Sequence, residues 1–186
     1  STGPSTRSST RASRARSSPF RRTSDREAST ALMVEASLRP RRTTVPPMPH
    51  AIRPAVPQDS PALQRLYGRA VADARWLPAE ARGWRDLAEA SKGEVLFVCC
   101  DPDGAIVGFV SVDRAAAFVH HLYVAPHRQR QGVGTALLDS LHSWLPMPWR
   151  LKCVVANARA MRFYEARGWT VEGHGTGPDG PCALLR

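Results

Sequence analysis

The chain has 186 residues, of which 42% are hydrophobic and 23% charged, and it carries a formal net charge of +10. That length suits one domain, and the hydrophobic fraction is large enough to form a core. No window of about eighteen apolar residues occurs, which argues against a membrane span, and the N-terminal region lacks the apolar stretch of a secretory signal.

The positive charge is concentrated near the N-terminus. Residues 1–47 contain ten Arg against three acidic residues, together with seventeen Ser or Thr and few bulky apolar residues. Because such a segment buries too little surface to offset its ordering entropy, we expect it to be disordered. A nucleic-acid-binding arm, an organelle transit peptide and a non-native extension are all open. The last is favoured, because Met48 opens a typical domain start, and the predicted domain is 48–186.

The four cysteines indicate neither a metal site nor a redox site. They lie in or beside apolar, strand-like runs and show no C-x-x-C spacing. Cys99 and Cys100 are adjacent, so they point to opposite faces of a strand and are not expected to form a disulfide. We expect Cys99, Cys100, Cys153 and Cys182 to be reduced thiols in a cytoplasmic protein.

The first part of the domain is predicted to contain a strand, two helices and a β-hairpin. Ser60 and Pro61 are typical of an N-cap and a first helical residue, and Lys92-Gly93 are expected to end the second helix. The predicted elements are a strand at Ile52–Ala55, a helix of about fifteen residues from Ser60, a helix at Ala79–Ala90, and hairpin strands at Glu94–Cys100 and Ala105–Val112.

The middle of the chain has the pattern of an anion site. An apolar strand, Phe118–Val124, leads through a Pro-containing turn to Gln129-Arg130-Gln131-Gly132-Val133-Gly134 and then into a helix at Val133–Trp144. Backbone N–H groups at a helix start lack intrahelical partners and lie at the positive end of the helix dipole, so they bind anions such as pyrophosphate. The pattern is neither a P-loop nor a dinucleotide fingerprint, because it has no Gly-Lys-Ser/Thr and has Leu137 where a third glycine would stand.

The remaining elements alternate between strands and one helix. The predicted helix begins after Asn157 as N-cap and ends at Gly168. The expected elements are a strand at Trp149–Val155, a helix at Ala158–Ala166, a strand from Trp169 to Glu172, a flexible loop at Gly173–Gly180 and a strand at Cys182–Leu185. This order predicts an α+β fold with a mixed sheet.

Two segments together resemble the GNAT superfamily of acyl-CoA-dependent N-acetyltransferases. Residues 129–134, QRQGVG, are similar to its Q/R-x-x-G-x-G/A element, and residues 157–169, NARAMRFYEARGW, to its N-x-x-A-x-x-F-Y-x-x-x-G-F/W stretch. Both follow a predicted strand, in the family's order. The resemblance covers nearly all of residues 50–186 and implies a three-layer fold, a mixed central β-sheet flanked by helices.

The resemblance implies acetyl-CoA as co-substrate and no metal. The anion site, residues 129–135, is called the cradle below. The strand before the cradle would hold the thioester carbonyl and the pantetheine arm, and the cradle would hold the pyrophosphate. Asn157 would cap its helix and also contact the co-substrate or an ordered water. The implied binding residues are the backbone of Leu122, Tyr123 and Val124, the cradle Gln129, Arg130, Gln131, Gly132, Val133, Gly134 and Thr135, and the side chains of Asn157 and Tyr164.

For catalysis, the resemblance assigns Tyr164 as the acid that protonates the departing thiolate. The base is less well defined, because Lys152 stands where some relatives carry a glutamate and residues 149–156 contain no acid. His120 is the preferred base, with His121 as the second choice, since an imidazole titrates near neutral pH. Strict strand alternation would place His120 with Phe118 and Leu122, and His121 on the opposite face.

The predicted activity is N-acetylation of a primary amine by direct attack in a ternary complex. The acceptor, a small molecule or a peptide, would enter beside the first two helices, and a homodimer is left open. Alternatives are a non-catalytic acyl-CoA-sensing module and a nucleic-acid-binding protein led by its basic tail; specific nucleic-acid or membrane binding is not expected. Candidate acceptor-side residues are Tyr67, Arg75, Trp76, Trp84, Arg85 and His174.

Overall fold

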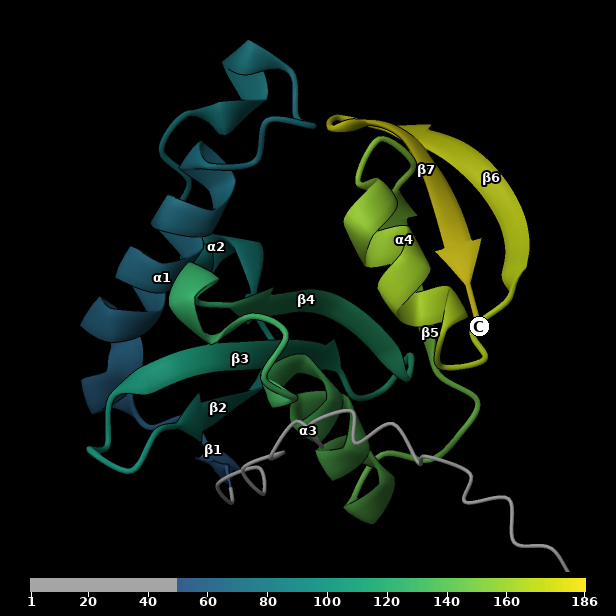
Figure 1. Ribbon diagram of the computed structural model, residues 1–186. Helices are drawn as coiled ribbons and strands as arrows, with labels where there is room; N and C mark the ends of the chain where they lie inside the picture. Colours follow the sequence, from purple (N-terminus) through teal and green to yellow (C-terminus); the bar gives the residue numbers. More distant parts are fainter. Residues whose placement is uncertain (1–49) are drawn as a thin grey trace, which may run out of the picture. The chain divides into compact units, whose positions relative to one another are not determined.

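The computed structural model describes residues 50–186, so the expectation for residues 1–47 lies outside the described residues. The described part contains a seven-stranded sheet in the order β1-β2-β3-β4-β5-β7-β6, in which only β4 and β5 are parallel (Figure 1). This mixed sheet with helices on both faces confirms the predicted α+β fold. The strands are β1 Ala51–Pro54, β2 Val95–Cys100, β3 Ile106–Asp113, β4 Phe118–Val124, β5 Arg150–Val154, β6 Val171–Gly177 and β7 Gly180–Leu185, and the α-helices are α1 Ser60–Ala72, α2 Leu87–Ala90, α3 Val133–Ser140 and α4 Ala158–Glu165.

Two hydrophobic clusters cover the two faces of the sheet. Helices α1 and α2 pack against one face, where Val98 and Phe109 are fully buried. Helices α3 and α4 pack against the other, which includes Val110. Cys99 lies in the second cluster and Cys100 in the first, as strand alternation predicts, and all four cysteines are free thiols.

Three expected local features are wrong. The predicted helix Ala79–Ala90 is split into a 3-10 turn, Ala79–Arg82, and the short α2, because Asp86 caps a new helix start by accepting hydrogen bonds from the N–H groups of Ala88 and Glu89. The predicted loop Gly173–Gly180 is mostly strand, since β6 pairs along its length with β7. The N-cap of α1 is Asp59, one residue before the predicted Ser60.

Helix α3 lies unusually close to β3. A Cβ atom added at Gly108 would be 2.9 Å from a methyl of Val133, 3.0 Å from the carbonyl oxygen of Tyr123 and 3.1 Å from a methyl of Leu137. Glycine at this position therefore allows the start of α3 to rest directly on the sheet, beside the end of β4.

Candidate functional site

Strands β4 and β5 separate soon after they meet. Only Phe118 with Arg150 and Val119 with Leu151 are in register, and beyond them the strands diverge (Figure 1). The N–H of Ala125, just after β4, bonds to the carbonyl of Val107 on β3 at 2.8 Å, so the backbone groups of alternate residues of β4 face β3. The backbone groups of Leu122 and Val124 therefore point into the gap, whereas those of Tyr123 pair with β3. Of the three predicted residues, Leu122 and Val124 present backbone donors there.

The cradle lies at the mouth of this gap. Gly132 is the N-cap of α3 with φ of 87°, and the N–H of Ala136 bonds to its carbonyl at 2.9 Å. The N–H groups of Val133, Gly134 and Thr135 come before the first donor of the intrahelical hydrogen bonds of α3, so they are available to an anion. The cradle packs closely against α4 at Gly134, since an added Cβ would lie 3.2 Å from the Phe163 ring and would push it aside. These residues fit a pyrophosphate group.

Two arginines that the sequence analysis did not identify reach the cradle: Arg159 of helix α4 and Arg167 of the turn that follows it. Arg159 donates to the side-chain oxygen of Gln129 at 2.6 Å, and Gln129 donates in turn to the carbonyl of Val124 at 3.0 Å. Arg167 donates to the hydroxyl of Thr135 and lies over the Phe163 ring, 3.7 Å from its centroid. Arg159 and Phe163 lie four residues apart on one face of α4, and Arg167 follows Phe163 by four residues in the turn after the helix. This spacing is a signal in the sequence, but only the tertiary structure shows that this face meets the cradle.

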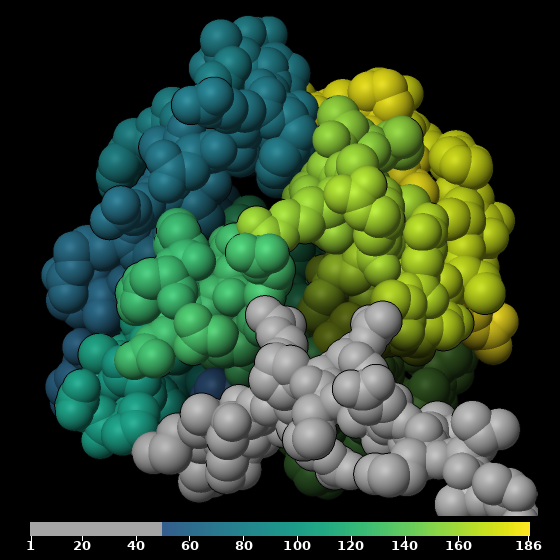
Figure 2. All heavy atoms as spheres, viewed as in Figure 1, coloured from purple at the N-terminus to yellow at the C-terminus, as the bar shows by residue number. Residues whose placement is uncertain are grey.

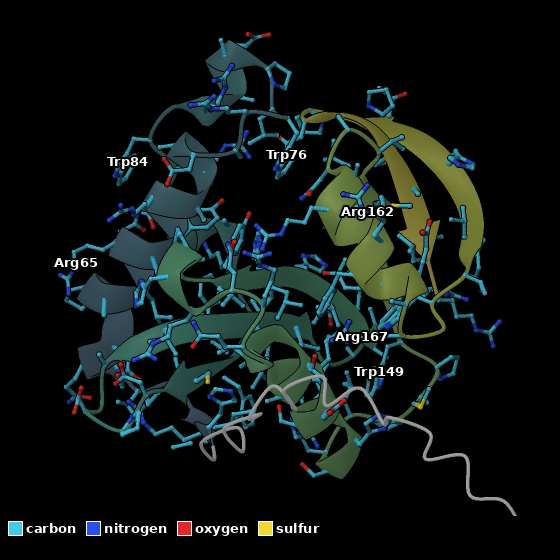
Figure 3. All side chains as sticks on the ribbon, in the orientation of Figure 1. Arg65, Trp76, Trp84, Trp149, Arg162 and Arg167 are labelled. Carbon is cyan, nitrogen blue, oxygen red and sulfur yellow. The ribbon has the colours of Figure 1, made fainter. Side chains whose placement is uncertain are left out.

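The surface is hollowed where these elements meet. Figure 2 shows the hollow between the α1–α2 segment, the cradle loop and α4. In Figure 3, Trp76 from the α1–α2 connection and Arg162 from α4 lie on opposite sides of it, Arg167 lies between α4 and α3, and Trp84 and Arg65 point away. Trp84 is 77% exposed, so it does not line the site, although the sequence suggested it.

Tyr164 lies on the side of α4 that faces the sheet. It is buried, packs against Trp169 with 5.7 Å between ring centroids, and lies near Cys153 of β5 and Tyr123 of β4. Burial, followed by the charges that Cys153 and Tyr123 carry when ionised, raises the pKa of Tyr164. Its hydroxyl therefore stays protonated at neutral pH, close to both strands that border the gap. Asn157 caps α4 as predicted, accepting from the N–H of Ala160 at 3.1 Å.

A β-bulge in β4 changes the expected placement of the two histidines. Ser111 pairs with His121 and Val112 pairs with Val119, which leaves His120 as the extra residue. Because a bulge interrupts strand alternation, His120 is on the α1–α2 side together with His121, and Leu122 packs on the opposite face. The predicted grouping of His120 with Leu122 is therefore wrong. The bulge comes immediately after the last β4–β5 pair, where the gap begins.

The His120 ring is held by a carboxylate that the sequence analysis missed. Glu94, just before β2, places Oε1 2.7 Å from Nδ1 of His120, and its other oxygen accepts a hydrogen bond from Ser111. The Glu94 side chain is 6% exposed and that of His120 is 40% exposed. No sequence signal connects positions 94, 111 and 120, because strand register brings them together.

The α1–α2 side of the gap has an aromatic floor. The ring of Tyr67 lies 5.6 Å from that of His121 and 5.5 Å from that of Tyr123. Burial lowers the pKa of His121 and raises those of the two tyrosines, so all three are neutral near pH 7. Arg85 lies above this floor and forms a two-point ion pair with Asp179 in the β6–β7 turn, with distances of 2.6 and 3.4 Å.

Two further candidates lie outside this arrangement. His174 is an exposed residue of β6, opposite Ala183, and Arg75 is exposed beyond α1. Within residues 50–186, no three His, Cys, Asp or Glu side chains gather as metal ligands. None of the helices in the described range is long and apolar enough to cross a membrane.

Comparison with known families matches residues 92–171 to the acetyltransferase (GNAT) domain. That stretch begins before β2 and includes β2 to β5, the cradle and α4. A curated relative, the peptidyl-lysine N-acetyltransferase YiaC of Escherichia coli K12, is 29% identical over 96 residues, or 50% of this chain and 64% of that protein. The chain thus matches less than two thirds of the relative's length.

Solved structures share the fold at lower sequence identity. Apo YjaB from Escherichia coli has a TM-score of 0.62 and 22% identity, over 74% of this chain and 97% of that one. YncA from Salmonella typhimurium, solved with acetyl-CoA, has a TM-score of 0.58 and 20% identity, over 74% and 87%. The ribosomal-protein-S18-alanine N-acetyltransferase of Escherichia coli has a TM-score of 0.56 and 22% identity, over 73% and 91%.

Proposed function

Because the chain belongs to the GNAT superfamily of acetyltransferases, we propose that it moves an acetyl group from acetyl-CoA to a primary amine by direct attack in a ternary complex. The observation that carries the proposal is the gap between β4 and β5, with the start of α3 at its mouth and Tyr164 and His120 beside it. A thioester chain fits such a gap, since its carbonyl oxygen can accept from strand N–H groups that have no neighbouring strand.

The cradle would hold the pyrophosphate of acetyl-CoA. The free amides of Val133, Gly134 and Thr135 supply donors, and the nearby Arg159 and Arg167 supply positive charge. Both arginines would exchange their contacts with Gln129 and Thr135 for phosphate oxygens. If the amide of Gln129, no longer held by Arg159, also turns away from Val124, the carbonyl of Val124 becomes free to accept from a pantetheine amide.

The reaction forms a C–N bond and breaks a C–S bond, and the amine nitrogen loses one proton while the sulfur gains one. In this proposal, His120 Nε2 accepts the proton from nitrogen as the nitrogen attacks the carbonyl carbon. The N–H groups of Leu122 and Val124 donate to the oxygen that becomes negative. Tyr164 then donates its phenolic proton to the departing thiolate, and the proton held by His120 returns to Tyr164 through solvent.

The acceptor would approach over the aromatic floor from the α1–α2 side. Tyr67, Tyr123 and His121 provide a neutral, mostly apolar surface there, which favours the uncharged amine needed for attack. The curated relative is named for action on peptidyl-lysine and one structural neighbour for action on an alanine of ribosomal protein S18. Both acceptors are amines, which supports the proposed class without selecting one.

The test is release of free thiol from acetyl-CoA in the presence of a panel of amines. Tyr164→Phe should lower kcat by about 100-fold or more, because the acid is lost while packing is kept. His120→Ala should also slow turnover, whereas His174→Ala, which removes an exposed imidazole on β6, should not.

Three results would contradict parts of the proposal. Full activity of Tyr164→Phe would remove Tyr164 as the acid. Binding of acetyl-CoA without acetylation of any amine would favour the sensing-module alternative. Failure to bind acetyl-CoA, measured by calorimetry, would exclude the function as a whole.

A further inference from the structure

Glu94 is a buried carboxylate whose partners are not those of an ordinary ion pair. Its side chain is 6% exposed, and a buried carboxylate is unfavourable unless it is hydrogen-bonded or paired with a charge. Two other carboxylates with little exposure, Asp59 and Asp101, are bound by the guanidinium groups of Arg53 and Arg128. Glu94 instead contacts the imidazole of His120 and the hydroxyl of Ser111.

The contact determines which nitrogen of His120 carries the proton. An ionised carboxylate only accepts hydrogen bonds, so Nδ1 of His120, at 2.7 Å, must be the donor. In the neutral ring this leaves the lone pair on Nε2. The hydroxyl of Ser111 is fully buried and donates to the second oxygen of Glu94, which holds the carboxylate plane.

His121 has a different arrangement. Its Nε2 lies 3.4 Å from the carbonyl oxygen of Ala90, which only accepts hydrogen bonds. Nε2 of His121 is therefore the donor in this contact and is not available as a base. Its ring is enclosed by Tyr67 and Tyr123. Of the two neighbouring imidazoles, His120 is the one that is 40% exposed and has a carboxylate behind Nδ1.

We propose that Glu94, supported by Ser111, is a positioning residue that fixes His120 with Nδ1 protonated and Nε2 available as the base. This inference rests on the proposed function for the role of His120, but the arrangement of the three side chains can be tested without an acceptor. Glu94 itself would not touch the substrate. The carboxylate would also stabilise the imidazolium that forms when Nε2 takes a proton.

The first experiment measures the tautomer of His120 directly in the full chain. Long-range ¹H–¹⁵N correlation spectra distinguish Nδ1–H from Nε2–H imidazoles, and His120→Gln assigns the signal. Neutral His120 should be in the Nδ1–H form in the unsubstituted protein. Finding the Nε2–H form would overturn the inference. This measurement uses the unsubstituted protein, so it does not depend on whether variants of Glu94 fold.

The second experiment removes the carboxylate. Glu94→Ala should convert His120 largely to the Nε2–H form and lower kcat by about 10-fold to 100-fold, with the KM for acetyl-CoA unchanged. Glu89→Ala, at an exposed glutamate of α2, is the matched control and should change neither property. Glu94→Asp should restore part of the Nδ1–H signal.

The outcomes separate the two proposals. A change of tautomer in Glu94→Ala, with no amine acetylated by any form of the protein, would support the positioning role and count against the proposed function. An active protein whose tautomer and kcat do not respond to Glu94→Ala would refute the positioning role and leave the function standing.

Discussion

Tyr164 illustrates how burial changes the chemistry of a residue that a motif identifies. Its pKa is raised, chiefly by burial, so the phenol is protonated throughout the neutral pH range. We therefore expect Tyr164 to contribute no limb to the pH profile of transfer near neutrality.

Asp59 provides a prediction about stability at the residue scale. Arg53 donates to its carboxylate at 2.6 and 2.9 Å and the N–H of Val56 at 2.9 Å, and these bonds lower its pKa from the ordinary 3.8 to about 2. Because the pKa is lower in the folded than in the unfolded state, the ionised Asp59 carboxylate makes its full contribution to the free energy of unfolding above a pH of about 4. This contribution is lost as the pH falls toward 2. Asp59→Asn should reduce the free energy of unfolding by about 2 kcal/mol at pH 7, and by less at pH 3.

Urea unfolding at the two pH values measures this effect. Asp73→Asn is a suitable control, because Asp73 is 62% exposed and its pair with Arg69 is 3.7 Å long. That variant should differ from the unsubstituted protein by less than about 0.5 kcal/mol. An equal effect of Asp59→Asn at both pH values would show that the charge of Asp59 does not contribute to the free energy of unfolding.

At the scale of elements, the β6–β7 hairpin is connected to the α1–α2 segment by one ion pair. Arg85 and Asp179 are 34% and 31% exposed and form two contacts across the acceptor side of the site. Asp179→Asn should increase amide hydrogen exchange at the hairpin turn by about fivefold, which corresponds to about 1 kcal/mol. In the double variant Arg85→Asp/Asp179→Arg, which reverses the ion pair, the rate of amide hydrogen exchange should return toward that of the unsubstituted protein.

Asp103→Asn, in the exposed turn between β2 and β3, is the control for that measurement and should leave the β6–β7 turn unaffected. Unchanged exchange in Asp179→Asn would mean that pairing between β6 and β7 alone holds the turn. The acceptor side would then be bordered by a hairpin that is independent of the α1–α2 segment.

At the scale of the whole molecule, charge and function are expected to lie in different parts of the chain. Residues 1–47 carry a net charge of +7 and residues 48–186 a net charge of +3. All residues proposed for transfer lie in 48–186, so we propose that removing 1–47 leaves the Tm and kcat/KM unchanged. Binding to DNA at low salt should occur only with the longer chain and should weaken steeply as salt increases.

A lower Tm for the shorter chain would contradict this division, because it would require residues 1–47 to stabilise the domain. DNA binding that persists in the shorter chain would instead place a basic surface within residues 48–186. Thermal unfolding and titration with a labelled duplex at two salt concentrations separate these results.

Local sequence signals predicted the order of the helices and strands and one part of the candidate site, the cradle. The cradle, the cap at Asn157 and the hairpin of β2 and β3 depend on backbone preferences within a few residues, so they could be predicted from the printed sequence. The order of the elements followed from the same signals. Where capping and glycine content gave ambiguous signals, as in residues 79–90 and 173–180, the prediction was wrong because a cap at Asp86 and pairing with β7 decided the outcome.

Only the tertiary structure decided which side chains meet. The bulge at His120 turns this ring to the same side as His121, and the register of β2, β3 and β4 brings Glu94 and Ser111 to it. In the same way, the packing of α4 against α3 brings Arg159 and Arg167 to the cradle. These contacts join positions 17 to 32 residues apart through strand register and helix packing, and no local pattern encodes a distance of that kind.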